Sequence, residues 1–288
     1  MPLTVAAAQY PISPFETFAD WQAHTARWVG EAANAGATVL LFPEYGAMEL
    51  TSLLAPARQA DLHGQIAAMQ AFLPAFIDTF RELSARHNLL IATPSIPVPA
   101  SGRVLNRVYV VDQGRILGAQ DKYFMTRFED EQWGISGRKA PPVLLETRWG
   151  PMGIQICYDV EFPFGAQALC ARGARLILAP SCTETVHGAS RVHIGARARA
   201  LENQCYVLVS QTVGEAPWSP AVDLNFGYAA CYAPPDTGLP DDGVVARMAP
   251  QTPGWLVQTL DFGLVDQVRR DGAVFNWKDM GRASFFPE

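Results

Sequence analysis

The sequence predicts one α/β domain in which helices cover mixed β-sheets. Short apolar runs that indicate buried strands alternate with helical segments along the whole chain. Several pairs of these strands are joined by short turns, which favours mixed sheets over a purely parallel sheet. No repeat, low-complexity tract or linker divides the chain, and its 288 residues, 49% of them hydrophobic, can bury a large core.

The first half of the chain is expected to start with a buried strand and to end in a β-hairpin. Gly36 stops the first predicted helix, and Gln113-Gly114 forms the hairpin turn. The expected elements are strand 3–9, helix 15–35, strand 38–42, a long helix 65–87 bent at Pro74, strand 89–92, a proline-rich loop 94–102, and hairpin strands 104–112 and 115–120.

The second half begins with an irregular segment, 124–142, and continues with strands and helices. The expected elements are strands 143–147 and 152–156, helix 163–172, strand 176–179, helix 191–204, strands 206–210 and 226–232, and a last strand pair, 244–248 and 255–260. We expect residues 1–265 to form the domain. Residues 266–288 lack clear periodicity and are expected to form a tail that packs on the domain or on a partner subunit.

Composition excludes several classes of function. The 22 basic and 28 acidic residues give a net charge of −6, and no basic run or basic amphipathic helix indicates nucleic acid or a membrane surface. No apolar run is long enough for a transmembrane helix. The five cysteines are scattered, odd in number and without C-x-x-C spacing, which predicts reduced thiols in a cytoplasmic protein. No residue cluster calls for a metal or an organic cofactor.

Three polar residues, Glu44, Lys122 and Cys157, each follow the end of a predicted buried strand. In layered α/β folds such strand ends can meet at one edge. Taken singly, the glutamate would be a solvated turn residue, the lysine a surface residue and the cysteine a packing residue. Together they supply the base, the cation and the thiol that acyl transfer requires. They are therefore candidate catalytic residues.

Residues 41–45 (LFPEY), 121–123 (DKY) and 156–163 (ICYDVEFP) resemble the three signature segments of the nitrilase superfamily, the carbon–nitrogen hydrolases. Their order and separations, 78 residues from Glu44 to Lys122 and 35 from Lys122 to Cys157, also fit that family. Residues 198–203 (ARALEN) resemble a structural signature farther along, and the resemblance runs from residue 3 to about residue 260. True nitrilases usually carry Trp-Glu after the nucleophile, so Cys157-Tyr158-Asp159 is more similar to the amidase-like branches.

The resemblance implies an α-β-β-α sandwich, with two mixed sheets packed face to face between helices, and homodimers or larger homo-oligomers. It also implies hydrolysis of a small-molecule amide through a thioester on Cys157, with release of ammonia or an amine. Glu44 would act as general base, and Lys122 with the backbone N–H of Tyr158 would stabilise the oxyanion. Nitrile or carbamoyl hydrolysis, or a catalytically silent binding subunit, are the alternatives, and the sequence does not name the substrate.

Many family members have a second active-site glutamate shortly after the lysine. Glu129 matches best because it follows a phenylalanine, as in relatives, and Glu131 is the alternative. Four further residues are candidates for contact with substrate. They are Tyr45, Trp133, Cys182 and Thr183.

Overall fold

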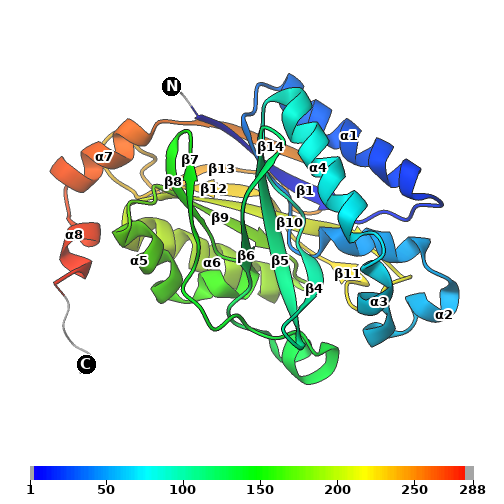
Figure 1. The fold of residues 1–288 in the computed structure, drawn as a ribbon. Helices are drawn as coiled ribbons and strands as arrows, with labels where there is room; N and C mark the ends of the chain where they lie inside the picture. The colour runs from blue at the N-terminus through cyan, green and yellow to red at the C-terminus, as the bar shows by residue number, and fades with distance from the viewer. Residues whose placement is uncertain (1–2, 283–288) are drawn as a thin grey trace.

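The computed structural model describes residues 3–282, in which the strands form one curled sheet with two halves (Figure 1). The main strand order is β4-β5-β3-β2-β1-β10-β9-β8-β7. At its centre, β1 (Leu3–Pro11) pairs in parallel with β10 (Tyr206–Glu215), and only its last three residues, Gln9 to Pro11, take part. The two expected sheets are therefore joined along a short seam.

The first half of the sheet is built from the N-terminal part of the chain and β14, which pairs antiparallel with β1. Its strands are β2 (Val39–Leu41), β3 (Leu90–Ala92), β4 (Ile96–Ala100), β5 (Arg103–Asp112), β6 (Arg115–Asp121) and β14 (Gly254–Leu260). The helices of this part are α1 (Phe18–Asn34), α2 (Pro56–Gln59), α3 (Leu62–Met69) and α4 (Leu73–His87).

The second half contains β10 and the other strands that follow Lys122, apart from β14. These strands are β7 (Leu144–Thr147), β8 (Gly150–Ile154), β9 (Leu176–Ser181), β11 (Leu224–Asn225), β12 (Ala230–Tyr232) and β13 (Val244–Arg247). Its helices are α5 (Pro163–Ala171), α6 (Val186–Asn203), α7 (Phe262–Asp271) and α8 (Asn276–Met280).

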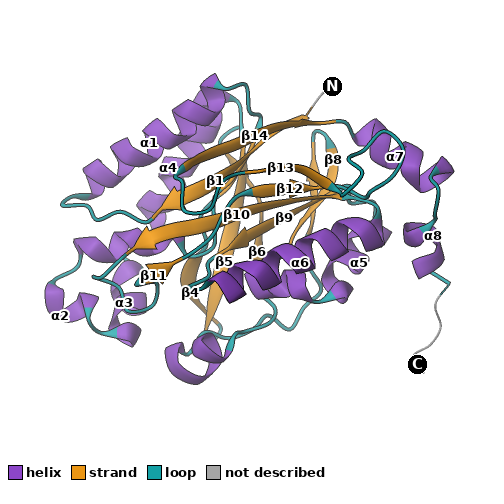
Figure 2. Ribbon diagram, turned by 180° about the vertical axis from the view of Figure 1, so that it is seen from behind, coloured by secondary structure: helices purple, strands orange, loops and turns teal. Residues whose placement is uncertain are grey.

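Alternate side chains of each strand point to opposite faces of the sheet, and each face packs against a different layer. Val5 and Ala7 of β1 lie in the same buried cluster as Leu178 and Val209 from the other half, so these faces pack against each other. The intervening residues of β1 face the opposite way and pack with the aromatic side chains of α1 and α4. Helices α5 and α6 cover the outer side of the second half, as Figure 2 shows. The predicted layering of helices around mixed sheets is thus observed.

Several predicted boundaries were wrong, each for a local reason. The segment expected as a proline-rich loop contains β4, and its two prolines are tolerated because β4 is an edge strand that pairs only with β5. The long helix 65–87 is two helices, and Pro74 lies in the first turn of α4 instead of bending one helix. Helix α6 begins at Val186, earlier than expected, because the Thr185 side chain caps it by accepting from Gly188 N–H. The strand expected from residue 226 starts at Ala230.

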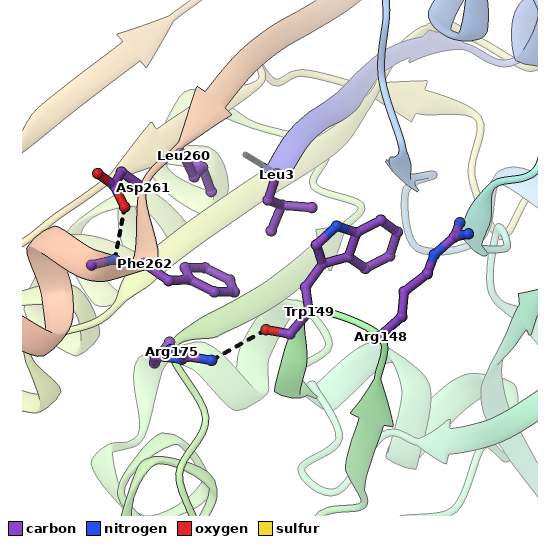
Figure 3. A pocket seen from close by; sticks show the side chains of 8 residues that line it. Leu3, Arg148, Trp149, Arg175, Leu260, Asp261 and Phe262 are labelled. Atoms are coloured by element: carbon purple, nitrogen blue, oxygen red, sulfur yellow. Dashed lines mark hydrogen bonds between the residues drawn. The ribbon is translucent and has the colours of Figure 1, made fainter. Parts of the chain in front are cut away.

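The junction with the C-terminal segment lies at the end of the sheet where β1 begins, at Leu3 (Figure 3). A cavity of about 300 Å³ lies here, between the Trp149 turn and the start of α7. The Arg175 guanidinium lies over the Phe262 ring, 4.8 Å from its centroid, and Nη2 donates to the Trp149 carbonyl at 3.2 Å. Its Nη1 also pairs with Asp266 at 2.8 Å.

Residues 266–282 pack on the domain, and the boundary expected at residue 265 falls inside α7. Arg269 of α7 donates through Nε to the Gln204 carbonyl at 2.9 Å and through Nη2 to the carbonyls of Ala174 and Asn203, at 2.9 and 3.1 Å. It also lies over the Trp277 ring. Residues 283–288 of the expected tail lie outside the described residues. Among residues 3–282, none of the helices combines the length and the apolar character that a membrane span requires.

Arg269→Ala should lower the free energy of unfolding by about 2–3 kcal/mol, because three carbonyls lose a charged donor. Urea unfolding followed by fluorescence measures the change. Arg270→Ala is the matched control: its exposed guanidinium pairs with Asp271, and its loss should cost less than about 0.5 kcal/mol. Equal effects of the two substitutions would show that Arg269 does not hold the C-terminal helices on the domain.

Candidate active site

The structure brings Glu44, Lys122, Glu129 and Cys157 together at one edge of the sheet, and each is at least 96% buried. Glu44 follows β2, Lys122 follows β6 directly, and Cys157 comes three residues after β8. Lys122 Nζ lies 2.8 Å from Glu44 Oε1 and 2.6 Å from Glu129 Oε2. One buried ammonium therefore bridges two buried carboxylates.

Hydrogen-bond donors contact both oxygens of the Glu44 carboxylate. Oε1 accepts from Lys122 Nζ and from Asn106 Nδ2, both at 2.8 Å, and Oε2 accepts from the backbone N–H of Cys182 at 3.0 Å. Burial raises the pKa of Glu44 to about 7, with Lys122 opposing the rise and Glu129 adding to it. A carboxyl group with a pKa near 7 is well suited to exchange protons near neutral pH.

Glu129 is held as an anion beside Lys122. Its carboxylate accepts from the Tyr45 hydroxyl at 2.6 Å and from the backbone N–H and hydroxyl of Thr126, both at 2.9 Å. Burial alone would raise the pKa of Glu129, but Lys122 and these donors lower it below the usual value. The two carboxylates in turn hold the pKa of Lys122 well above its ordinary value despite burial, so the ammonium stays charged.

The alternative glutamate lies elsewhere. Glu131 is half exposed and forms an ion pair with Arg127 at 2.9 Å on the protein surface. Residues Glu129–Trp133 form one π-helical turn, which directs Glu129 inward. Of the two candidates, Glu129 is the glutamate that contacts Lys122.

Cys157 has a strained backbone. Its φ of 49° lies in the left-handed region, and it opens the 3₁₀ turn Cys157–Glu161. Its Sγ lies 3.5 Å from the Cys182 carbonyl oxygen. Burial raises the pKa of the thiol well above its usual value, and Glu44 adds to the rise while Lys122 opposes it. The thiol is therefore neutral at rest and requires a base to become a nucleophile.

Asp159, two residues after the thiol, fixes this turn against the Lys122 loop. Its carboxylate accepts from the backbone N–H groups of Phe124 at 2.8 Å, Tyr123 at 3.1 Å and Ile156 at 3.3 Å. Arg199 supports the same turn, because Nη1 donates to the Val160 carbonyl at 3.1 Å.

A cavity of about 720 Å³ opens above the cluster, and Tyr45, Trp133, Cys182, Thr183 and Tyr158 all line it. The side-chain polar groups of the first four residues already form hydrogen bonds within the protein. The Tyr45 hydroxyl donates to Glu129, the Trp133 indole N–H to the Leu62 carbonyl, the Cys182 thiol to Asn225 Oδ1 and the Thr183 hydroxyl to the Phe226 carbonyl. Their contribution to binding would come chiefly from shape and apolar surface.

Asn106 was not singled out from the sequence, although it contacts Glu44 directly. It lies on β5, on the same face as Val108 and Val110, and is fully buried with them. An asparagine on the apolar face of an otherwise hydrophobic strand is the signal that could have revealed it.

The comparisons with known proteins identify the family of the chain. The sequence pattern of the family described as "Carbon-nitrogen hydrolase" matches residues 4–270, and the chain belongs to this family, as the motifs predicted. Among curated proteins, it is 30% identical over 281 residues to "Probable hydrolase YhcX" of Bacillus subtilis, an alignment that spans 98% of this chain and 54% of that protein. It is 27% identical over 257 residues to "Omega-amidase, chloroplastic" of Arabidopsis thaliana, spanning 85% of this chain and 64% of that protein.

A solved structure supports the fold class. The carbon–nitrogen hydrolase from Helicobacter pylori G27 superposes with a TM-score of 0.78 at 15% identity, covering 98% of this chain and 95% of that one. The predicted nitrilase-like α/β fold is confirmed. The chain spans between about half and two thirds of the length of the two curated relatives.

Proposed function

We propose that this carbon–nitrogen hydrolase cleaves a small-molecule amide through a thioester on Cys157. The observation that carries the proposal is the buried cluster in which Lys122 joins Glu44 to Glu129 beside the Cys157 thiol at the base of a cavity. The similarity to an omega-amidase supports an amide as the substrate class.

In the proposed reaction, Glu44 takes the proton from Cys157 Sγ, and the sulfur attacks the amide carbon. Lys122 and the backbone N–H of Tyr158 stabilise the oxyanion of the tetrahedral intermediate. Losing one such donor typically costs on the order of 10²–10³ in rate. The intermediate collapses, the C–N bond breaks, and Glu44 returns the proton to the leaving nitrogen.

The second half of the reaction reuses the same groups. Water enters after the amine has left, and Glu44 removes its proton as the water oxygen attacks the thioester carbon. The C–S bond then breaks, the carboxylic acid leaves, and the proton returns to sulfur. Glu129 touches neither sulfur nor Glu44 in this scheme, and keeps Lys122 charged and in place.

Alternatives within the family are nitrile and carbamoyl hydrolysis, which would use the same thiol. The sequence after the nucleophile, Tyr158-Asp159, favours an amide over a nitrile. A silent binding subunit is disfavoured because base, cation and thiol are all present and in contact with one another or with Cys182.

The decisive experiment measures ammonia release from a panel of small amides, dicarboxylate monoamides, nitriles and carbamoyl compounds. The wild-type chain should release ammonia from at least one amide, and Cys157→Ala should release none above background while its circular dichroism spectrum is unchanged. Lys122→Ala should lose at least 10²-fold in kcat/KM. Equal release by wild type and Cys157→Ala would mean that Cys157 is not the nucleophile.

The two glutamates of the 129–133 turn give a matched pair for testing the role of Glu129. Glu129→Gln should lower kcat at least tenfold, because a neutral amide replaces the carboxylate that positions Lys122. Glu131→Gln removes a surface ion pair and should leave kcat within twofold of wild type. If the Glu131 variant is the impaired one, the second active-site glutamate has been misassigned.

We also propose that the chain forms a homodimer through the outer faces of α5 and α6. Four large apolar side chains are exposed there, namely Phe164, Val186, Ile194 and Leu201, and Ile194 is 69% exposed. Such surfaces are typical of subunit contacts.

Light scattering on the full chain tests the dimer. Ile194→Glu should shift the mass to that of a monomer, because a carboxylate would be buried without a partner. Val274→Glu, at an exposed apolar position after α7, should leave the mass unchanged. A wild-type chain that is already monomeric at micromolar concentration would rule out this interface.

A further inference from the structure

Asn106 lies beneath the cavity without lining it. Its side chain is fully buried on the inward face of β5, and Nδ2 donates to Glu44 Oε1 at 2.8 Å. Its backbone carbonyl accepts from Lys122 N–H at 2.9 Å, so the residue also touches the strand that carries the lysine. Its Oδ1 has no hydrogen-bond partner within residues 3–282.

We propose that Asn106 is a positioning residue that determines which oxygen of Glu44 receives the thiol proton. The inference rests on the proposed role of Glu44 as general base. An ionised carboxylate oxygen offers two lone pairs in its plane. Oε1 accepts two hydrogen bonds, from Asn106 and Lys122, whereas Oε2 accepts one, from Cys182 N–H. The lone pair that is left to take a proton therefore lies on Oε2.

The position of Cys182 places that oxygen next to the nucleophile. The N–H of Cys182 points to Glu44 Oε2, and the carbonyl of the same residue lies 3.5 Å from Cys157 Sγ. The backbone of Cys182 thus contacts both Glu44 Oε2, the acceptor oxygen, and the Cys157 thiol. Without the Asn106 donor, Oε1 would regain a free lone pair, and the carboxylate could rotate or take the proton on the side away from sulfur.

An asparagine at this position is explained better by Glu44 than by packing. Val108 and Val110 fill the same face of β5 with apolar side chains, and Asn106 brings an unpartnered oxygen into that core. The amide is also a neutral donor. It orients the carboxylate without adding a second positive charge, which would lower the pKa of Glu44 and weaken it as a base.

The test follows thiol activation directly and needs no known substrate. The full chain is treated with iodoacetamide from pH 5 to 9, and carbamidomethylation of Cys157 is timed by peptide mass spectrometry. Asn106→Leu keeps a similar side-chain volume and removes the donor, and Asn106→Ala is the second variant in case the first fails to fold. Both should alkylate about tenfold more slowly at pH 7, with the midpoint of the pH profile shifted up by about one unit, because the ionised carboxylate has lost a donor.

Two further variants distinguish failure of the Asn106 proposal from failure of the proposed function. Asn203→Ala loses a buried hydrogen bond to the Arg199 carbonyl, away from Glu44, and should keep the wild-type pH profile. Glu44→Gln should slow alkylation more than either Asn106 variant. If Glu44→Gln slows alkylation while both Asn106 variants follow the wild-type profile, Asn106 has no positioning role. If Glu44→Gln also behaves like wild type, Glu44 is not the base and the proposed function fails with it.

A substrate from the ammonia panel adds an independent readout. Because Asn106 does not line the cavity, both variants should lower kcat about tenfold and leave KM within about twofold. A raised KM with unchanged kcat would instead indicate distortion of the cavity and would overturn the proposal.

Discussion

The geometry of the candidate active site depends on one buried ammonium group, that of Lys122, which two carboxylates share. Removing three charges from water is costly, and the cluster persists because each charge is compensated by close contacts. Lys122 lies within 2.8 Å of both glutamates, and Glu129 is further stabilised by Tyr45 and Thr126. Burial raises the pKa of Glu44 to about 7, and Glu129 adds to the rise while Lys122 opposes it. Burial, with the nearby charge of Glu44 adding to it, also raises the pKa of the neighbouring Cys157 thiol.

This cluster requires both halves of the curled sheet. Glu44 and Lys122 follow β2 and β6 in the first half, whereas Cys157 and Cys182 follow β8 and β9 in the second. The β1–β10 seam holds the two halves in register over only three residue pairs. The contacts between Cys182 and Glu44, and between Asp159 and the Lys122 loop, therefore add links across the edge where the site lies.

Much of this arrangement could be predicted from the sequence, because it follows from strand ends and short motifs. Glu44, Lys122 and Cys157 were each expected just past the end of a strand, so their common edge was predictable, although the strand before Lys122, β6, is exposed over its first three residues. Periodicity could not separate Glu129 from Glu131, because a π-helical turn has neither the strand nor the α-helix period, and only the resemblance to relatives favoured Glu129. Strand β4 was hidden by its prolines, and α7 by a polar sequence with two inward valines, Val265 and Val268. Asn106 escaped notice because a single polar residue in a hairpin strand normally faces solvent.

The division between predictable and unpredictable residues has a physical meaning. Residues that react must stand at strand ends, where the backbone turns and side chains can meet a substrate, so motifs mark them. Residues that aim the reactive groups can lie inside regular elements, where only a three-dimensional contact distinguishes them from packing residues. Asn106 is of this second kind, and together with the backbone N–H of Cys182, which stands just past the end of β9, it contacts both oxygens of Glu44. A glutamate with a pKa near neutrality could take its proton on either oxygen. In the proposed reaction, orientation by neutral donors restricts that choice while leaving Glu44 strong enough to act as the base.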